Sequence, residues 1–242
     1  MRRILIIKCG SKLPVLSHVP GDFEDWILDG MALGKSPAVT VAVHSNGTLP
    51  PAESVRGVIV TGSPAMVTDD LPWIAHTRAW LADAVAQSIP TLGICFGHQL
   101  LAQALGGRVD YNPAGIEVGT INLTLADGVG FDPLLHGLPR EIQVQASHRQ
   151  SVLQLPPDAL RLASSALDPN HAFRFRKHAW GLQFHPEFSS EISRIYIEYY
   201  RNQLDNRHKS PEALISELAD TPVGGQILKR FFAVIDATVR PT

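Results

Sequence analysis

The sequence has few cysteines, no long apolar run and no excess of either charge. Its two cysteines, Cys9 and Cys95, are far apart in a chain of 242 residues, so no disulfide framework is expected. No apolar stretch approaches the roughly 20 residues of a membrane span, and the opening apolar run is too short for a signal-peptide core. With 21 basic and 23 acidic residues, neither a nucleic-acid surface nor a membrane surface is indicated. These absences predict a protein of the reduced cytoplasm.

The strongest chemical signal lies between Pro90 and Leu101. An apolar, strand-like run ends in Gly93-x-Cys95-x-Gly97 and passes directly into a helical pattern, which predicts a sharp turn with Cys95 at its apex. Glycines beside the cysteine let the strand and helix backbones approach each other, and the N-terminus of the helix stabilises a thiolate. A lone cysteine often packs as a small hydrophobe, but this context favours a nucleophile.

A cysteine nucleophile needs a base and a group that orients the base. Residues 179–184 alternate like a strand, and the pattern then breaks at His185-Pro186-Glu187. Because Pro186 makes the turn rigid, the Glu187 carboxylate can fold back onto the His185 imidazole and hold one tautomer. A histidine alone could be a satisfied core or surface residue; its place at a strand end favours catalysis.

These two motifs together resemble those of the class I glutamine amidotransferase family, triad type. Gly93-Ile94-Cys95-Phe96-Gly97-His98-Gln99 and Phe184-His185-Pro186-Glu187 are separated by about ninety residues, as in that family. The resemblance covers roughly residues 1–200. It is closest to the amidotransferase portion of GMP synthase and to stand-alone relatives.

The resemblance implies further site residues. An oxyanion hole would form from the backbone amides of Ser63 and Phe96, with Ser63 standing where a second glycine is usual. Glutamine would be held by a set of residues around the same pocket: Gly62, Gln99, Ser147 and His148. No cofactor is required for this chemistry.

The pattern of apolar runs predicts an α/β protein. Buried strands are expected at residues 4–7, 39–43 and 55–61, a helix at 72–87, and short alternating strands from 108 to 184. With the resemblance, this predicts a flavodoxin-like, open, mostly parallel sheet with helices on both faces and an added layer of antiparallel strands. We expect one domain over residues 1–204 and a helical C-terminal extension over residues 205–242.

Two other patterns have structural interpretations. The ten histidines and two cysteines show no spacing typical of a metal site, so no metal is expected. The run from Phe173 to His178 interleaves aromatic and basic residues, as some nucleic-acid-binding segments do. Strand alternation, with phenylalanine inward and arginine outward, explains it better.

The expected function is hydrolysis of the glutamine side-chain amide, which releases ammonia through a cysteine thioester. Two alternatives remain open: a γ-glutamyl peptidase or hydrolase with the same Cys-His-Glu triad, and a non-enzymatic binding or regulatory protein of the same fold.

An ammonia acceptor enzyme would be a separate, unknown protein. After Ser147-His148 the chain has Arg149-Gln150 where relatives of GMP synthase usually have Gly-Asp or a similar acidic step, so we expect no docking to a GMP-synthetase-type partner.

Overall fold

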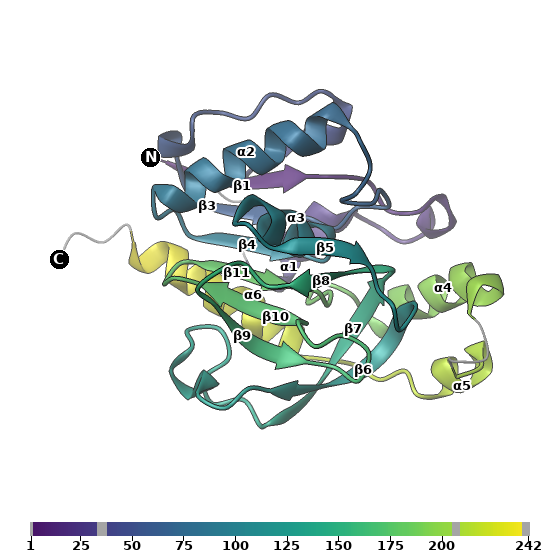
Figure 1. The fold of residues 1–242 in the computed structure, drawn as a ribbon. Coiled ribbons are helices and arrows are strands. Elements are labelled where there is room, and N and C mark those ends of the chain that lie inside the picture. Colours follow the sequence, from purple (N-terminus) through teal and green to yellow (C-terminus); the bar gives the residue numbers. More distant parts are fainter. Residues whose placement is uncertain (1, 33–37, 205–208, 239–242) are drawn as a thin grey trace.

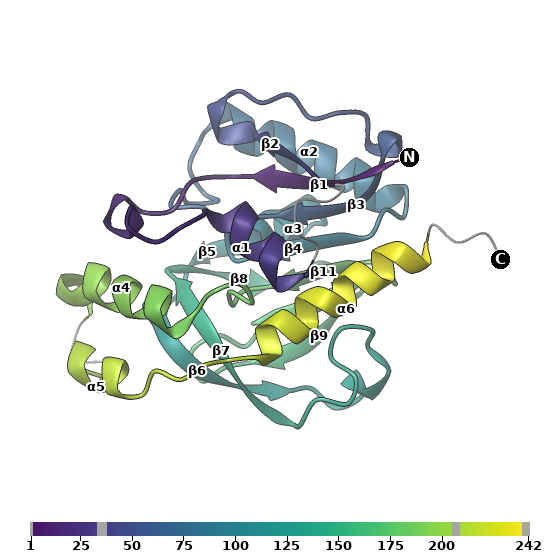
Figure 2. The same cartoon turned by 180° about the vertical axis from the view of Figure 1, so that it is seen from behind.

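The chain is built around one central sheet of nine strands, seen in a computed structural model that describes residues 2–32, 38–204 and 209–238 (Figures 1 and 2). The strand order is β2-β1-β3-β4-β11-β10-β9-β6-β7, and β5 and β8 form a separate pair. The strands are β1 (Arg3–Lys8), β2 (Ala38–Ala42), β3 (Val55–Val60), β4 (Thr91–Ile94), β5 (Arg108–Tyr111), β6 (Glu117–Leu125), β7 (Glu141–His148), β8 (Gln150–Gln154), β9 (Ala159–Ser164), β10 (Ala172–Phe175) and β11 (Ala179–Leu182).

One half of the sheet is parallel, from β2 through β1, β3 and β4 to β11. Its central strands are runs of apolar residues because both faces are covered; the four residues of β4 and the four of β11 are all buried. The motif residues Cys95 and His185 follow β4 and β11, which are hydrogen-bonded neighbours. Their neighbouring strands therefore bring residues ninety positions apart to the same edge of the sheet.

The other half of the sheet is antiparallel and contains β10, β9, β6 and β7. These strands continue the central sheet beyond β11, so most of the expected antiparallel layer is an extension of the same sheet. Strand β10 contains only the first three residues of the aromatic and basic run, which continues into the following turn. Phe173 is fully buried, while Arg174 is half-buried and forms an ion pair with Asp132 at 3.0 Å. The α/β fold with a mostly parallel core, antiparallel strands and flanking helices is confirmed.

Helices cover both faces of the sheet. Figure 1 shows α2 and α3 on one face, and Figure 2 shows α1 and α6 on the other. The helices are α1 (Phe23–Gly30), α2 (Pro72–Ala86), α3 (Phe96–Ala104), α4 (Ser190–Tyr200), α5 (Pro211–Ser216) and α6 (Val223–Ala237). Short 3-10 turns lie at Pro14–Leu16, Val43–Ser45, Ala52–Ser54, Val129–Phe131 and Arg201–Gln203.

The C-terminal helix α6 belongs to the hydrophobic core. One of its faces is fully buried and packs with Trp180, whose ring lies 6.1 Å from that of Phe231 in an edge-to-face contact; the buried residues are Ile227, Leu228, Phe231 and Ile235. The expected domain boundary at residue 204 stays a prediction, and residues 205–208 and 239–242 of the expected extension lie outside the described part of the chain. Among the helices described, none has both the length and the apolar composition needed to cross a membrane.

Candidate active site

Cys95 occupies a strained turn between β4 and α3. Its backbone has φ 52° and ψ −104°, a conformation that non-glycine residues rarely adopt. A Cβ on Gly93 would lie 2.3 Å from the carbonyl oxygen of Gly97, and a Cβ on Gly97 would lie 2.4 Å from the carbonyl oxygen of Val60. Both glycines are therefore required by close backbone packing, as the motif predicts.

His185 is held on both sides by the turn that follows β11. Its backbone amide donates to the carbonyl of Gln145 at 2.8 Å, and its Nδ1 lies 2.7 Å from Glu187 Oε1. The ring of Phe188 stacks on the imidazole, with centroids 3.8 Å apart. Burial lowers the pKa of His185, but its neighbours Glu187 and Cys95 outweigh burial and raise the pKa to about 10. These partners therefore favour the protonated form of His185.

Cys95, His185 and the loop after β3 meet at one pocket. A Cβ on Gly62 would lie 3.0 Å from His185 Cε1 and 3.9 Å from Cys95 Cβ, so Gly62 leaves room for both side chains. Cys95 and His185 both line the pocket, and the Glu187 side chain is buried behind the imidazole. The structure thus brings together the three residues that the two motifs predict as a triad.

Ser63 fits the loop without a left-handed backbone, since it is not among the residues with positive φ. Its hydroxyl donates to the carbonyl of Cys9 at 2.8 Å and accepts from the amide of Ala65 at 3.1 Å. These two hydrogen bonds of the Ser63 side chain stabilise the loop. Ser63 also lines the pocket, next to Gly62 in the chain. Cys9 is buried, and burial raises the pKa of its thiol, as expected of a structural cysteine.

The turn from Ser147 to Gln150 forms the opposite wall of the pocket. Gln99, from the first turns of α3, donates through its amide to the carbonyl of Gln150 at 2.7 Å and to Gln183 Oε1 at 3.0 Å. The Gln150 side chain accepts from the amide of Val67 and donates to Thr68 Oγ1 at 2.6 Å. Gln99 lines the pocket as predicted, and its amide also fixes the facing turn.

Sequence reasoning missed a buried cluster behind this wall, formed by Glu117, His148 and His171. Glu117 Oε2 lies 2.9 Å from Nε2 of each histidine. His148 Nδ1 is 3.0 Å from the carbonyl of Gln150, so both of its nitrogens face acceptors and must carry protons. Burial lowers the pKa of His148, but Glu117 raises it to about 9. Only the cross-strand register of β6 and β7, which pairs Glu117 with His148, reveals the cluster.

The cluster also contains residue types that bind metals. The donor atoms of Glu117, His148 and His171 all lie within 4.8 Å of one another. Hydrogen bonds to the carboxylate occupy the two Nε2 atoms that a metal ion would need, so a hydrogen-bonded charge cluster accounts for the geometry. The expectation of no metal stays a prediction.

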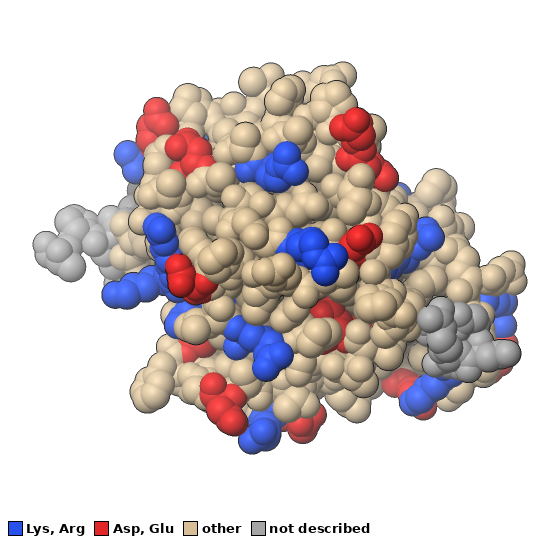
Figure 3. All heavy atoms as spheres, in the orientation of Figure 1, with Lys and Arg blue, Asp and Glu red and all other residues tan. Residues whose placement is uncertain are grey.

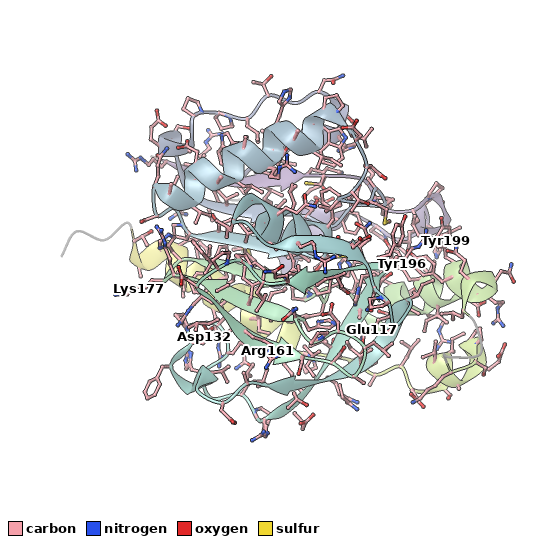
Figure 4. All side chains as sticks on the ribbon, in the orientation of Figure 1. Glu117, Asp132, Arg161, Lys177, Tyr196 and Tyr199 are labelled. Carbon is pink, nitrogen blue, oxygen red and sulfur yellow. The ribbon has the colours of Figure 1, made fainter. Side chains whose placement is uncertain are left out.

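Helix α4 adds tyrosines to the pocket lining that the sequence did not predict as site residues. Tyr196, Tyr199 and Tyr200 all line the pocket. Figure 4 shows Tyr196 and Tyr199 on the side of the molecule where α4 faces the rest of the fold. Tyr196 is buried and Tyr199 is 46% exposed, so α4 contributes both an inner wall and an outer rim.

The model of the family described as "Glutamine amidotransferase class-I" matches residues 30–201, which is most of the chain. The chain belongs to the class I glutamine amidotransferase family. Among curated relatives, a subunit of the glutamine-hydrolyzing GMP synthase of Archaeoglobus fulgidus is 31% identical over 69% of this chain and 84% of that protein. The glutamine-hydrolyzing GMP synthase of Thermomicrobium roseum is 40% identical over 55% of this chain.

The chain spans only part of some of these relatives. Its match covers 24% of the Thermomicrobium roseum protein and 31% of the GMP synthase of Aeropyrum pernix.

Among solved structures, a glutamine amido transferase from Methylobacillus flagellatus matches all of this chain and 97% of its own, with a TM-score of 0.79 and 24% identity. A glutamine amidotransferase from Thermotoga maritima gives a TM-score of 0.75 at 20% identity over 97% of this chain and 98% of its own. At these identities the structural matches show the shared fold.

Proposed function

We propose that the protein hydrolyses the side-chain amide of glutamine and releases ammonia through a thioester on Cys95. The family supports glutamine hydrolysis in general terms. The observation that supports the specific assignment is the strained Cys95 turn, which shares its pocket with the His185 imidazole, whose Nδ1 lies 2.7 Å from Glu187 Oε1.

The reaction can be written with these groups. The Cys95 thiolate attacks the amide carbon, and the amides of Phe96 and Ser63 stabilise the oxyanion. His185 gives its proton to the departing nitrogen, the C–N bond breaks and ammonia leaves. The neutral His185 then removes a proton from water, which attacks the thioester and releases glutamate and the thiolate. Glu187 keeps the imidazole oriented and stabilises its charged form in both steps.

In this proposal the glutamine lies in the pocket between the Gly62 loop and the turn that contains Ser147 and His148. Gln99 fixes that turn through its side-chain amide. Water, glutamine and these side chains supply every atom and proton of the reaction, so the proposed steps need no cofactor or metal.

The acceptor of ammonia and its enzyme are proposed to be separate from this chain. On the face drawn in Figure 3, basic and acidic side chains are interspersed, which agrees with the expectation of no nucleic-acid or membrane partner. The cytoplasm is the proposed location.

The test is a side-by-side assay of glutamine, a γ-glutamyl dipeptide and glutathione with wild type and Cys95→Ala. We expect ammonia and glutamate from glutamine with wild type and no turnover of any substrate with Cys95→Ala. Turnover retained by the variant would remove Cys95 from the mechanism. Turnover of only the peptides would replace the amidotransferase assignment with a γ-glutamyl hydrolase.

A further inference from the structure

The ring of Phe188 covers one face of the His185 imidazole. The two ring centres are 3.8 Å apart and the planes are inclined by 10°, so the rings are stacked almost in parallel. Phe188 also closes the turn that begins at His185, because its amide donates to the His185 carbonyl at 3.4 Å. Pro186 stands second in this turn, where proline is favoured. The turn therefore folds the phenyl ring back over the histidine.

A group of aromatic rings from two helices holds Phe188 in place. Tyr196, on α4, stacks on Phe188 with ring centres 5.2 Å apart, and Trp26, on α1, meets it edge-on at 5.9 Å. Phe23 lies beside the stack, 6.3 Å from the ring centre of His185 and 6.2 Å from that of Phe188. Phe188 is only 6% exposed. These contacts fix the plane of the Phe188 ring, and the stacked Phe188 ring in turn restricts the plane of the imidazole.

Titratable groups from several elements also surround the imidazole. Glu187 Oε1 lies 2.7 Å from its Nδ1, and Cys95, from the turn after β4, lines the same pocket. On α4, burial raises the pKa of the Tyr196 hydroxyl, so that this neighbour stays neutral. At the start of α1, Asp22 forms an ion pair with Lys8 at 2.7 Å. Glu187 and Cys95 therefore dominate the charge around the imidazole, while Phe188 offers it the face of a neutral ring.

We infer that Phe188 is a positioning residue for His185: its ring face holds the plane of the imidazole and stabilises the imidazolium over the neutral ring. The face of an aromatic ring carries partial negative charge and attracts a cation placed over it. Since Glu187 binds Nδ1, Nε2 is the nitrogen left for proton transfer, and stacking restricts its rotation away from the site. Phe188 is not among the described residues that line the pocket, so it acts through His185. Only the link to proton transfer rests on the proposed function.

The first test is Phe188→Leu, which removes the ring and keeps an apolar side chain. For glutamine, kcat should fall about 10-fold or more and KM should change less than about twofold, because the lost contact acts on proton transfer. The alkaline limb of kcat/KM should move about half a pH unit or more lower, because the imidazolium loses the ring face that stabilises it. A lower kcat with an unmoved alkaline limb would overturn the inference, because it would show lost packing alone.

A series of fluorinated phenylalanines at position 188 separates the charge effect from packing, and it does so even if Phe188→Leu fails to fold. Fluorine withdraws electrons from the ring face and changes the shape of the ring little. The alkaline limb should therefore move lower in steps from phenylalanine to its mono-, di- and trifluorinated forms. The same residues at position 131 are the matched control, because Phe131 is 94% exposed and lies outside the pocket lining; they should change nothing. A limb that ignored the fluorine number at position 188 would overturn the inference.

An NMR titration of the His185 imidazole separates this inference from the proposed function, because it needs no turnover. It is measured in Cys95→Ala and in Cys95→Ala/Phe188→Leu, and the resonance is assigned by its absence from His185→Gln. A midpoint about half a pH unit or more lower in the double variant would support the inference even if wild type hydrolysed nothing. Equal midpoints would overturn the inference even if glutamine were hydrolysed.

Discussion

At the scale of single residues, the proposed site depends on a few positions whose backbone requirements are strict and local. Gly93 and Gly97 are needed where backbones come within contact distance, and Pro186 fixes a turn, so these positions are visible in sequence. Glu117 was not visible, because its role depends on lying opposite His148 across two strands. Arg149 was visible only as a departure from the family pattern, and its place in the pocket wall required the structure.

The charge of His185 gives a prediction for Glu187→Gln. In wild type, the protonated His185 that gives its proton to ammonia should persist until the pH rises through about 10, so the fall in kcat/KM that His185 causes should lie on that alkaline limb. Without the Glu187 carboxylate the pKa of His185 falls, so the limb should move at least about one pH unit lower and kcat should drop about 10²-fold or more.

The measurement is a pH profile of kcat/KM for both proteins with the same substrate. The amino group of glutamine titrates identically in the two experiments, so the displacement between the profiles reports His185. Superimposable alkaline limbs would contradict the assignment of Glu187.

At the scale of elements, the His185–Glu187 turn is supported by a segment far along the chain. Gln145 binds the His185 amide through its carbonyl, and its side chain donates to the carbonyl of Ala219 at 2.8 Å. A Cβ on Gly224, in the first turn of α6, would lie 2.3 Å from the carbonyl oxygen of Pro186. The start of α6 therefore presses against the turn that carries the proposed base.

Gly224→Ala should displace this turn and lower kcat about 10²-fold, because small misplacement of a catalytic group is costly. Gly225→Ala is the matched control: its added Cβ would have no neighbour closer than 3.9 Å, and alanine favours a helix over glycine. Steady-state kinetics and thermal unfolding are measured for both variants. Equal activity of the two variants would show that α6 has no influence on the site.

The Glu117–His148 pair gives a prediction about stability. Glu117→Gln leaves the buried imidazolium without its carboxylate, and the free energy of unfolding should fall by about 3 kcal/mol at pH 6. Because the pKa of His148 is raised and that of Glu117 is lowered in the folded state, the contribution of the pair is complete between about pH 4.5 and pH 6.5, the ordinary values of the two groups, and is lost as the pH rises through about 9. The difference between wild type and variant should therefore shrink at alkaline pH.

Denaturant unfolding at pH 6 and at pH 10 measures this difference. Glu53→Gln, at an exposed position, is the control and should change the stability little at either pH. A deficit of Glu117→Gln that stayed constant between the two pH values would argue against a charged His148.

At the scale of the whole molecule, the parallel half of the sheet could be predicted from buried apolar runs, and the antiparallel strands from their alternation. Their continuation of the same sheet could not, because strand order depends on pairings such as that of β11 with β10. The packing of α6 on Trp180 could not be predicted either. The apolar stripe of the helix predicts that one face is buried, but not which surface covers that face.

The turn after Ser147 also bears on partners. Gln150 is buried and hydrogen-bonded, so it cannot present a contact to another protein, and Arg149 lines the pocket. Neither position supplies the acidic step expected of a surface that meets a GMP synthetase, so docking would lack that charged contact. We predict that the isolated chain hydrolyses its substrate without such a partner.

Steady-state glutaminase rates are compared with and without a purified ATP-dependent GMP synthetase. The expected result is a measurable rate for the isolated chain that the synthetase does not change. A rate near zero that rises by orders of magnitude when the synthetase is added would contradict the prediction.

If Cys95 is the nucleophile of a γ-glutamyl site, an electrophile that mimics glutamine should label it covalently. The protein is incubated with a glutamine analogue that carries a diazo-ketone in place of the side-chain amide, and peptide mass spectrometry locates the adduct. We expect one adduct, on Cys95, formed more slowly by Glu187→Gln and absent from Cys95→Ala. An unlabelled Cys95, or an adduct on Cys9, would contradict it.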